Sequence, residues 1–168
     1  LKLNTKYYNY KMPKSNLFEN KNLQIVILVG GYGKRLGKLT ANTPKPLIEI
    51  NEKPFLEYLV NYLINQGFKN FLFLAGFKGT KLKLFIKKKF SKKFLKLDFF
   101  IEKKPMGTGY VLKKSQKKLS KEFILINGDT FTNLNYKKFL KNINPKKLIN
   151  LCVSRKKSNS SGNFFIKK

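Results

Sequence analysis

A glycine-rich segment followed by two separated cations could bind a chain of phosphate groups. Residues 30–33 read Gly-Gly-Tyr-Gly and come directly after the apolar run 24–29. Glycines let the backbone turn sharply and bring its N–H groups close to a ligand. Arg35 and Lys45 then place positive charge near the end of the same run. An ordinary strand-to-helix turn and a surface arginine are the alternative interpretations.

A carboxylate at the end of another apolar run could hold a metal ion. The run 122–127 ends in Asn127-Gly128-Asp129, and the chain has only one other aspartate, Asp98. Magnesium is a hard ion that is bound by few carboxylates together with substrate phosphates. Asp129 is therefore a candidate ligand for Mg²⁺, and a turn-forming aspartate is the alternative interpretation.

These residues need a scaffold that brings the ends of distant strands together. From residue 23 onward, strand-like runs alternate with segments of helical spacing, which predicts an α/β fold with a mostly parallel sheet. The expected strands are 24–29, 69–75, 95–102, 122–127 and 148–154. The expected helices are one that begins at Pro54 and is closed by Gly67, and those over 82–90, 108–119 and 136–143. Ligands bind outside the carboxyl ends of such strands. Three candidate segments, 30–35, 102–109 and 127–129, lie at such ends.

The glycine segment does not match two common nucleotide-binding motifs. No G-x-x-x-x-G-K-[ST] occurs, and Leu36 stands where the dinucleotide fingerprint requires glycine. The chain also contains no histidine, which excludes Ser-His-Asp and Cys-His catalysis and histidine-ligated zinc.

The formal charge of +29 comes almost entirely from 35 lysines, against two arginines. Lysine, asparagine and phenylalanine are encoded by AT-rich codons, so a drift in base composition explains the excess. Bidentate contacts with base edges favour arginine. We therefore expect non-specific binding of polyanions at low salt and no specific nucleic-acid partner.

The apolar runs are short, and the chain contains a single cysteine. No run approaches the about 20 residues that span a bilayer, and the N-terminal segment lacks the apolar core of a signal peptide. We therefore expect a cytoplasmic protein without a membrane partner. Cys152, the only cysteine, lies in the apolar run 148–153 and is expected to be a small buried residue.

The pattern G-G-x-G-x-R-L at 30–36, followed by P-K-P-L at 44–47, resembles the signature of sugar-phosphate nucleotidyltransferases. Residues 102–109 resemble the family's E-x-x-P-L-G-T-G segment, and 127–129 resemble its N-G-D motif. The nearest branch is that of the heptose 1-phosphate and mannose 1-phosphate guanylyltransferases. Three positions depart from the usual pattern, namely Val29, Lys34 and Tyr110, where the family mostly has Ala, Thr and Gly.

The resemblance implies a Rossmann-like three-layer fold and a defined reaction. A sugar 1-phosphate attacks the α-phosphate of a nucleoside triphosphate in line, with Mg²⁺, and gives a nucleotide sugar and pyrophosphate. GTP and a sugar of the heptose or mannose type are the implied substrates. The alternative is a remnant of the same fold that binds nucleotides or polyanions without turnover.

The resemblance also assigns roles to individual residues. Arg35, Lys45 and Asp129 would be catalytic, and Asp129 would bind Mg²⁺. Glu102 would accept hydrogen bonds from the N–H groups of the base, and a solvent-exposed acid at the end of a strand is the alternative interpretation. The nucleotide-binding residues would be Val29, Gly30, Gly31, Gly33, Glu102, Gly107, Thr108 and Gly109.

The domain organisation follows from the same comparison. Residues 1–22 are expected to form a poorly ordered extension, and 23–168 a nucleotidyltransferase domain without its usual C-terminal part. In the family, that part supplies a second metal-binding aspartate and much of the sugar pocket. Homo-oligomers are left open.

Overall fold

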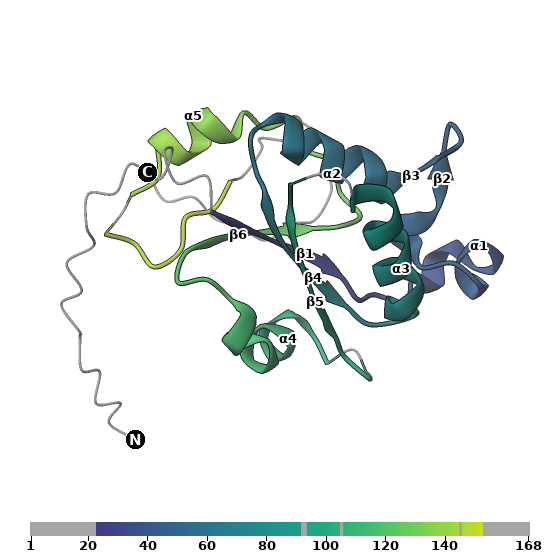
Figure 1. The fold of residues 1–168 in the computed structure, drawn as a ribbon. Coiled ribbons are helices and arrows are strands. Elements are labelled where there is room, and N and C mark those ends of the chain that lie inside the picture. Colours follow the sequence, from purple (N-terminus) through teal and green to yellow (C-terminus); the bar gives the residue numbers. More distant parts are fainter. Residues whose placement is uncertain (1–22, 92–93, 105, 145, 153–168) are drawn as a thin grey trace, which may run out of the picture.

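A four-stranded parallel sheet forms the centre of the computed structural model (Figure 1), which describes residues 23–91, 94–104, 106–144 and 146–152. The strands are β1 (Gln24–Val29), β4 (Asn70–Ala75), β5 (Lys96–Ile101) and β6 (Phe123–Asn127). Their order across the sheet is β5-β4-β1-β6. Every pair is parallel, in agreement with the alternation of strands and helices along the chain.

Helices cover both faces of the sheet, so the fold has the three expected layers (Figure 1). Helices α2 (Phe55–Asn65), α3 (Gly79–Phe90) and α5 (Tyr136–Lys141) pack on one face, and α4 (Thr108–Lys114) packs on the other. The remaining elements are short: α1 (Lys38–Ala41), the 3-10 turns η1 (Lys34–Leu36), η2 (Lys45–Leu47) and η3 (Gln116–Lys118), and the hairpin β2 (Glu49–Ile50) and β3 (Lys53–Pro54). The architecture is therefore α/β and Rossmann-like, as predicted.

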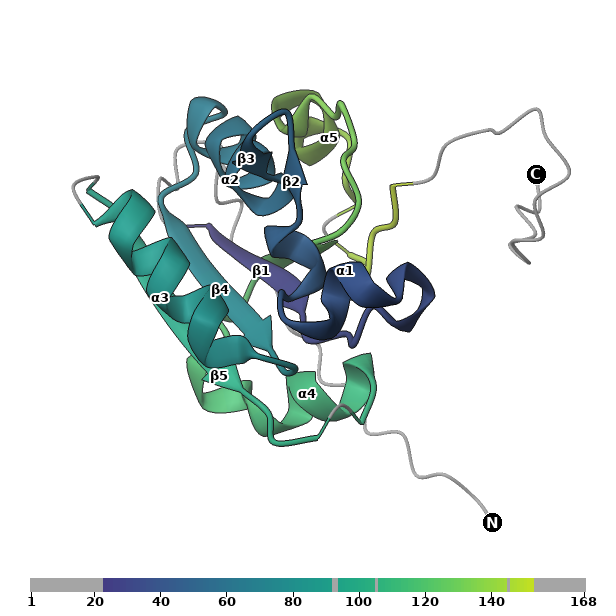
Figure 2. The ribbon, with the colours of Figure 1, turned by 90° about the vertical axis from the view of Figure 1, so that its right-hand side faces the viewer.

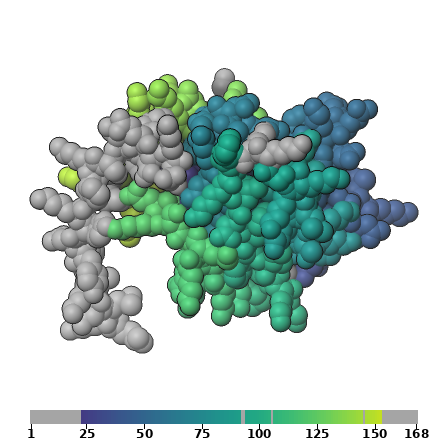
Figure 3. Space-filling view, viewed as in Figure 1, coloured from purple at the N-terminus to yellow at the C-terminus, as the bar shows by residue number. Residues whose placement is uncertain are grey.

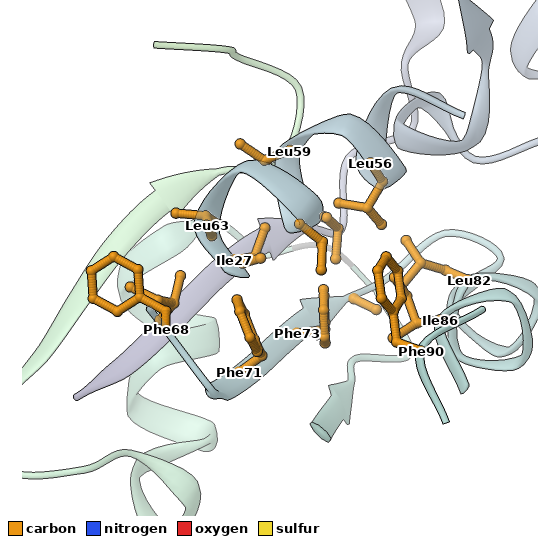
Figure 4. Packing of buried hydrophobic residues seen from close by; sticks show 14 of the residues in the cluster. Ile27, Leu56, Leu59, Leu63, Phe68, Phe71, Phe73, Leu82, Ile86 and Phe90 are labelled. Carbon is orange, nitrogen blue, oxygen red and sulfur yellow. The ribbon is translucent and has the colours of Figure 1, made fainter. Parts of the chain in front are cut away.

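The larger core lies between the sheet and the α2–α3 face (Figure 4). Alternate residues of β1 and β4 point to this face, since side chains of a strand alternate between the two sides of a sheet. Ile27, Phe71 and Phe73 are fully buried there, and Leu63 of α2 packs in the same cluster. The opposite residues, among them Val26, form the smaller core under α4. Burial on both sides explains why β1 and β4 are continuous apolar runs.

The order of the strands reverses at β1, which is where a ligand site is expected in an open α/β sheet. The chain runs from β1 to β4 and β5 on one side and then returns to place β6 on the other side of β1. Such a reversal separates the loops that leave β1 and β6, and ligands of open α/β sheets bind there. Figure 2 looks from the side of the molecule that carries α1 and the β2–β3 hairpin, next to the end of β1. The predicted site segments after β1 and β6 meet at this edge.

The predicted strand over 148–154 is wrong for its described residues. Residues 148–152 form no strand, and Leu148, Ile149 and Leu151 are largely exposed. An apolar run forms a strand only where a neighbouring strand can pair with it, and none of the described strands does so. Cys152 is exposed rather than buried for the same reason. Residues 153 and 154 lie outside the described part of the chain.

Two further helices are shorter than the sequence predicts. The expected helix 108–119 divides into α4 and the turn η3, because the backbone changes direction at Ser115. The buried Ser115 donates a hydrogen bond from its hydroxyl to the carbonyl of Leu112, at 3.3 Å. The helix expected over 136–143 ends at Lys141.

The face that carries α3 and β5 is strongly basic. These segments make up much of the surface in Figure 3, where they are coloured teal. Lys81, Lys87, Lys88 and Lys89 of α3 are exposed, and Leu82, Ile86 and Phe90 of the same helix are buried. Among the described residues, no helix has the length and apolarity needed to cross a membrane.

Candidate active site

Lys45 and Asp129 form an ion pair at the edge of the sheet where β1 and β6 end. The ammonium of Lys45 donates a hydrogen bond to Asp129 Oδ2 at 2.7 Å, although the two residues are 84 positions apart in the chain. Both side chains are about two-fifths exposed, at 39% and 41%. Two of the three predicted catalytic residues therefore meet, in a position that solutes can reach.

The backbone around Lys45 is held on both sides by prolines. Pro44 precedes the turn η2 and Pro46 lies within it, and both are buried. Proline restricts the backbone to a narrow range of φ, which stiffens the segment. The turn is closed by hydrogen bonds from Leu47 N–H to the Pro44 carbonyl, at 2.8 Å, and from Ile48 N–H to the Lys45 carbonyl, at 3.1 Å. This local rigidity directs the Lys45 side chain toward Asp129.

Asp129 is positioned through the glycine that precedes it. Gly128 N–H donates to the Leu28 carbonyl of β1 at 2.9 Å, so the chain leaving β6 is drawn against the neighbouring strand. Thr130 Oγ1 donates to Asp129 Oδ1 at 3.2 Å. The hydrogen bond from Lys45 is the main cause that lowers the pKa of Asp129, against the opposing effect of burial. The carboxylate is thus stabilised in its charged form.

The segment that follows Asp129 is fastened to helix α2. Tyr62 donates its hydroxyl to the Leu134 carbonyl at 2.8 Å, and its ring contacts Phe131 with centroids 4.9 Å apart. Gln66 donates to the same carbonyl at 2.9 Å and accepts from the Tyr136 N–H at 3.0 Å. Helix α2 therefore limits the movement of the chain between Asp129 and α5.

The glycine loop after β1 is folded against the Lys45 segment. Gly33 has a φ of +65°, in the left-handed region that favours glycine, and a Cβ there would lie 2.8 Å from Thr40 Cγ2 and 3.1 Å from Lys45 Cβ. The buried Thr40 donates its hydroxyl to the carbonyls of Gly33 and Gly37, both at 3.1 Å. The loop, Thr40 and Lys45 therefore form one packed unit.

Arg35 lies on this loop, in the turn η1, with an exposed side chain. Within the described part of the chain, its guanidinium has no hydrogen-bond or ion-pair partner. The structure thus places Arg35 on the loop whose Gly33 packs against Lys45, but it joins only Lys45 and Asp129 directly. A guanidinium that no internal partner engages can bind an external anion.

Glu102 follows β5 and reaches back over the ends of β4 and β1. Its Oε1 would lie 3.0 Å from a Cβ at Gly30 and 3.3 Å from a Cβ at Gly76, so both glycines leave room for the carboxylate. Its Oε2 is buried and accepts no hydrogen bond from any described residue. Burial of a polar atom without a partner is costly, and a ligand donor would remove that cost.

The other predicted nucleotide-binding residues divide into two groups. The side chain of Val29 is buried, so only its main chain is available to a ligand, whereas Gly31 is exposed with open space around it. Gly107, Thr108 and Gly109 are exposed at the start of α4, where Gly107 has a φ of +93°. Among the described residues, no hydrogen bond or ion pair joins these three to the Lys45–Asp129 pair.

Several residues that were not predicted as site residues also shape the site. Lys78 donates to the Asn42 side-chain oxygen at 3.2 Å, and Lys81 donates to the Asn42 carbonyl at 3.0 Å. These bonds tie the start of α3 to the chain just before Lys45. Tyr32 of the glycine loop contacts Phe77 after β4, with ring centroids 5.4 Å apart. Lysines and aromatic residues are so frequent in this chain that spacing alone does not single them out.

The donors around Asp129 suit a magnesium ion that shares its coordination with a substrate. Three or more acidic, histidine or cysteine side chains do not gather anywhere among the described residues. Asp129 offers a carboxylate, already paired with a cationic group, and Thr130 offers a hydroxyl beside it. Mg²⁺ is usually held by one or two carboxylates, waters and substrate phosphates. The donor set therefore fits this ion.

Comparison with known proteins identifies the family of the chain. The chain is 36% identical over 137 residues to D-glycero-alpha-D-manno-heptose 1-phosphate guanylyltransferase of Campylobacter jejuni, which covers 82% of this chain and 59% of that protein. It is 30% identical over 118 residues to mannose-1-phosphate guanyltransferase of Aspergillus oryzae, covering 68% of this chain and 32% of the relative. It thus spans little more than half of the first relative.

Solved structures give the same result. The crystal structure of HddC from Yersinia pseudotuberculosis complexed with GMP-PN superimposes with a TM-score of 0.61 and 38% sequence identity, over 71% of this chain and 53% of that one. A model of the nucleotidyl transferase family matches residues 24–165, which include the glycine loop, Lys45, Glu102 and Asp129. The chain belongs to the nucleotidyl transferase family.

Proposed function

We propose that this protein transfers a nucleotide from a nucleoside triphosphate to a sugar 1-phosphate and releases pyrophosphate. GTP is the proposed nucleotide, and a heptose or mannose type sugar 1-phosphate is the proposed acceptor. The observation that carries the proposal is the 2.7 Å pair of Lys45 and Asp129 at the point where the strand order reverses. The relatives named above as guanylyltransferases support the choice of substrates.

The residues of the site would act by position and charge. The N–H groups of the glycine loop would hold the leaving phosphates, and Arg35 and Lys45 would neutralise negative charge as the α-phosphorus is attacked in line. Asp129, with Thr130 beside it, would hold Mg²⁺, which when bound supplies further charge neutralisation and orients the phosphates. No covalent intermediate is needed, which suits a chain without histidine.

Glu102 is the proposed partner of the guanine base. Its buried Oε2 lacks a hydrogen-bond donor among the described residues, and Oε1 lies where side chains at Gly30 and Gly76 would crowd it. A guanine presents two neighbouring N–H donors on one edge, and a carboxylate has two acceptor oxygens to receive them. This pairing would favour guanine over adenine.

Pyrophosphate release by the 168-residue chain tests the proposal. The chain is incubated with Mg²⁺, mannose 1-phosphate or a heptose 1-phosphate, and GTP, ATP, CTP or UTP in turn. Asp129→Asn and Lys45→Met are expected to lower kcat/KM by about 100-fold or more. The matched controls, Asp98→Asn and Lys38→Met, alter an aspartate and a lysine away from the pair and are expected to leave kcat/KM near its original value.

Two results would contradict the proposal. Turnover that Asp129→Asn leaves unchanged would show that the predicted site is not the active site. Binding of GTP without pyrophosphate release from any sugar 1-phosphate would identify a nucleotide-binding protein that retains the fold without the reaction.

A further inference from the structure

We propose that Lys45 and the divalent cation compete for the Asp129 carboxylate, so that metal binding releases the Lys45 ammonium toward the phosphates. This inference rests on the proposed role of Asp129 in binding the metal. It assigns to Lys45 a second role, namely control over when the site accepts a metal and when its own charge becomes available.

Both oxygens of the carboxylate are already engaged by the protein. Lys45 Nζ lies 2.7 Å from Asp129 Oδ2, and Thr130 Oγ1 lies 3.2 Å from Oδ1. Each carboxylate oxygen has two lone pairs, so one hydrogen bond does not by itself block a metal. A metal that ligates Oδ2 beside the ammonium would, however, meet the repulsion of a full positive charge at close range. The two cations therefore compete for this oxygen.

The Lys45 side chain can leave without disturbing the backbone that carries it. Its Cβ packs against Gly33, and its backbone is confined between Pro44 and Pro46. Beyond Cβ the stem is flexible, and the ammonium can rotate to a new partner. The pair is two-fifths exposed on both sides, so the internal bond holding it is weak and the neighbouring solvent is open to ions.

The exchange couples the metal to the phosphate-binding charge. While the ion pair is intact, one carboxylate and one ammonium neutralise each other, and neither is available to a nucleotide. Once a divalent cation takes Asp129, Lys45 is released beside the glycine loop, which carries Arg35. A nucleotide that arrives with its metal thus meets one more free cation than a nucleotide without metal.

Binding of Mn²⁺ in the absence of nucleotide tests the exchange. Free Mn²⁺ is measured by electron paramagnetic resonance during titration of the 168-residue chain and of its variants. Lys45→Met is expected to bind Mn²⁺ about fivefold more tightly than the original chain, because it removes the competing cation. Lys34→Met is the matched control, since Lys34 lies on the neighbouring glycine loop and its ammonium is 5.8 Å from the Tyr32 ring centroid. It is expected to change the affinity much less.

Asp129→Asn, alone and combined with Lys45→Met, separates the two ways in which the inference can fail. Binding that depends on Asp129 but is equal or weaker in Lys45→Met would overturn the exchange and leave the proposed metal site intact. If Asp129→Asn leaves Mn²⁺ binding unchanged both in the original chain and in Lys45→Met, Asp129 is not a metal ligand. That result would overturn both the proposed metal site and the exchange. An equal gain from Lys34→Met would show general repulsion rather than competition for one oxygen.

Reactivity of the lysine amines provides a second measurement without turnover. Modification of Lys45 by an N-hydroxysuccinimide ester, followed by peptide mass spectrometry, is expected to rise with Mg²⁺ relative to Lys38. The rise should be absent in Asp129→Asn. An unchanged ratio in the original chain would contradict the release of Lys45.

Discussion

Gly128 lies directly against Val29, across the ends of the two strands that meet at the site. A Cβ at Gly128 would overlap Val29 Cγ1 and would lie 2.9 Å from the Leu28 carbonyl oxygen. The Gly128 N–H donates to that same oxygen. The absence of a side chain at one position thus determines how closely Asp129 approaches the loop that follows β1.

Replacement of Gly128 by alanine is expected to lower the free energy of unfolding by about 1–3 kcal/mol, because the new methyl group must displace Val29 or the chain leaving β6. Urea denaturation followed by circular dichroism measures the change. Gly31→Ala is the control, since a Cβ at Gly31 meets nothing within 4 Å. Equal losses in the two variants would show that the contact with Val29 does not matter.

The pKa of Asp129 is expected to rise toward the ordinary value of 3.8 in Lys45→Met, because the hydrogen bond from Lys45 is the main cause of its lowering. The chain has only two aspartates, so their carboxyl ¹³C resonances can be followed separately during a pH titration. The pKa of Asp98 should stay unchanged. Burial raises the pKa of Asp98, but hydrogen bonds from Lys118 and from the Phe99 N–H lower it more, so the pKa is lowered overall. Lys45 does not contribute to this shift.

The same ion pair makes a small contribution to stability that depends on pH. Because the folded pKa of Asp129 is lowered, the contribution is present above pH 3.8 and is lost as the pH falls through the folded pKa. Both side chains are exposed enough that the contribution is below about 1 kcal/mol. The difference in unfolding free energy between the original chain and Lys45→Met should therefore shrink between pH 6 and the acid range.

Glu102→Gln is expected to weaken binding of GTP by about tenfold and to change binding of ATP little, since an acceptor oxygen for the guanine N–H groups becomes a donor. Isothermal titration calorimetry with both nucleotides and Mg²⁺ measures the two affinities. Glu49→Gln, on the exposed strand β2, is the control. A uniform loss for both nucleotides would assign Glu102 a general role in the shape of the site.

Glu52→Gly is expected to raise the free energy of unfolding by about 0.5–1 kcal/mol. Asn51 and Glu52 connect β2 and β3 with φ values of +49° and +64°, and the second of these positions strongly favours glycine in hairpins. Denaturation midpoints in urea provide the measurement. Glu49→Gly, in a strand with ordinary backbone geometry, should lower the free energy of unfolding instead. A loss of stability in Glu52→Gly would contradict the interpretation.

Most of the fold could be predicted because its elements are encoded locally. The apolar runs that form β1 and β4 are buried on both sides, so their pattern survives without knowledge of the partners. The helix α2 begins after Pro54, as its spacing indicates. The meeting of Lys45 and Asp129 could be inferred because each follows a strand of one parallel sheet. The strand predicted over 148–154 is wrong at residues 148–152. An apolar run forms a strand only if another strand pairs with it, and the local sequence pattern does not show whether such a partner exists.

The hydrogen bonds that hold the site segments in place could not be predicted, since they join residues that no local pattern relates to each other. Nothing in the spacing of Thr40 indicates that its hydroxyl closes the glycine loop. Nor does the position of Tyr62 in an amphipathic helix indicate its bond to Leu134. The roles of Arg35 and of Gly107, Thr108 and Gly109 stay predictions, because the structure places them without joining them to the pair.

The two partners of the ion pair are linked to strands that differ in their number of hydrogen-bonded neighbours. Lys45 packs against the loop that follows β1, and Asp129 follows β6. Within the described part of the chain, β1 is hydrogen-bonded on both sides, whereas β6 is hydrogen-bonded to β1 alone. Local opening is easiest where fewest bonds must break. Transient fraying of β6 would carry the carboxylate away from the ammonium while the loop above β1 kept its shape. Amide hydrogen exchange at Ile126 and Asn127 would thus report how often the ion pair comes apart in an otherwise folded molecule.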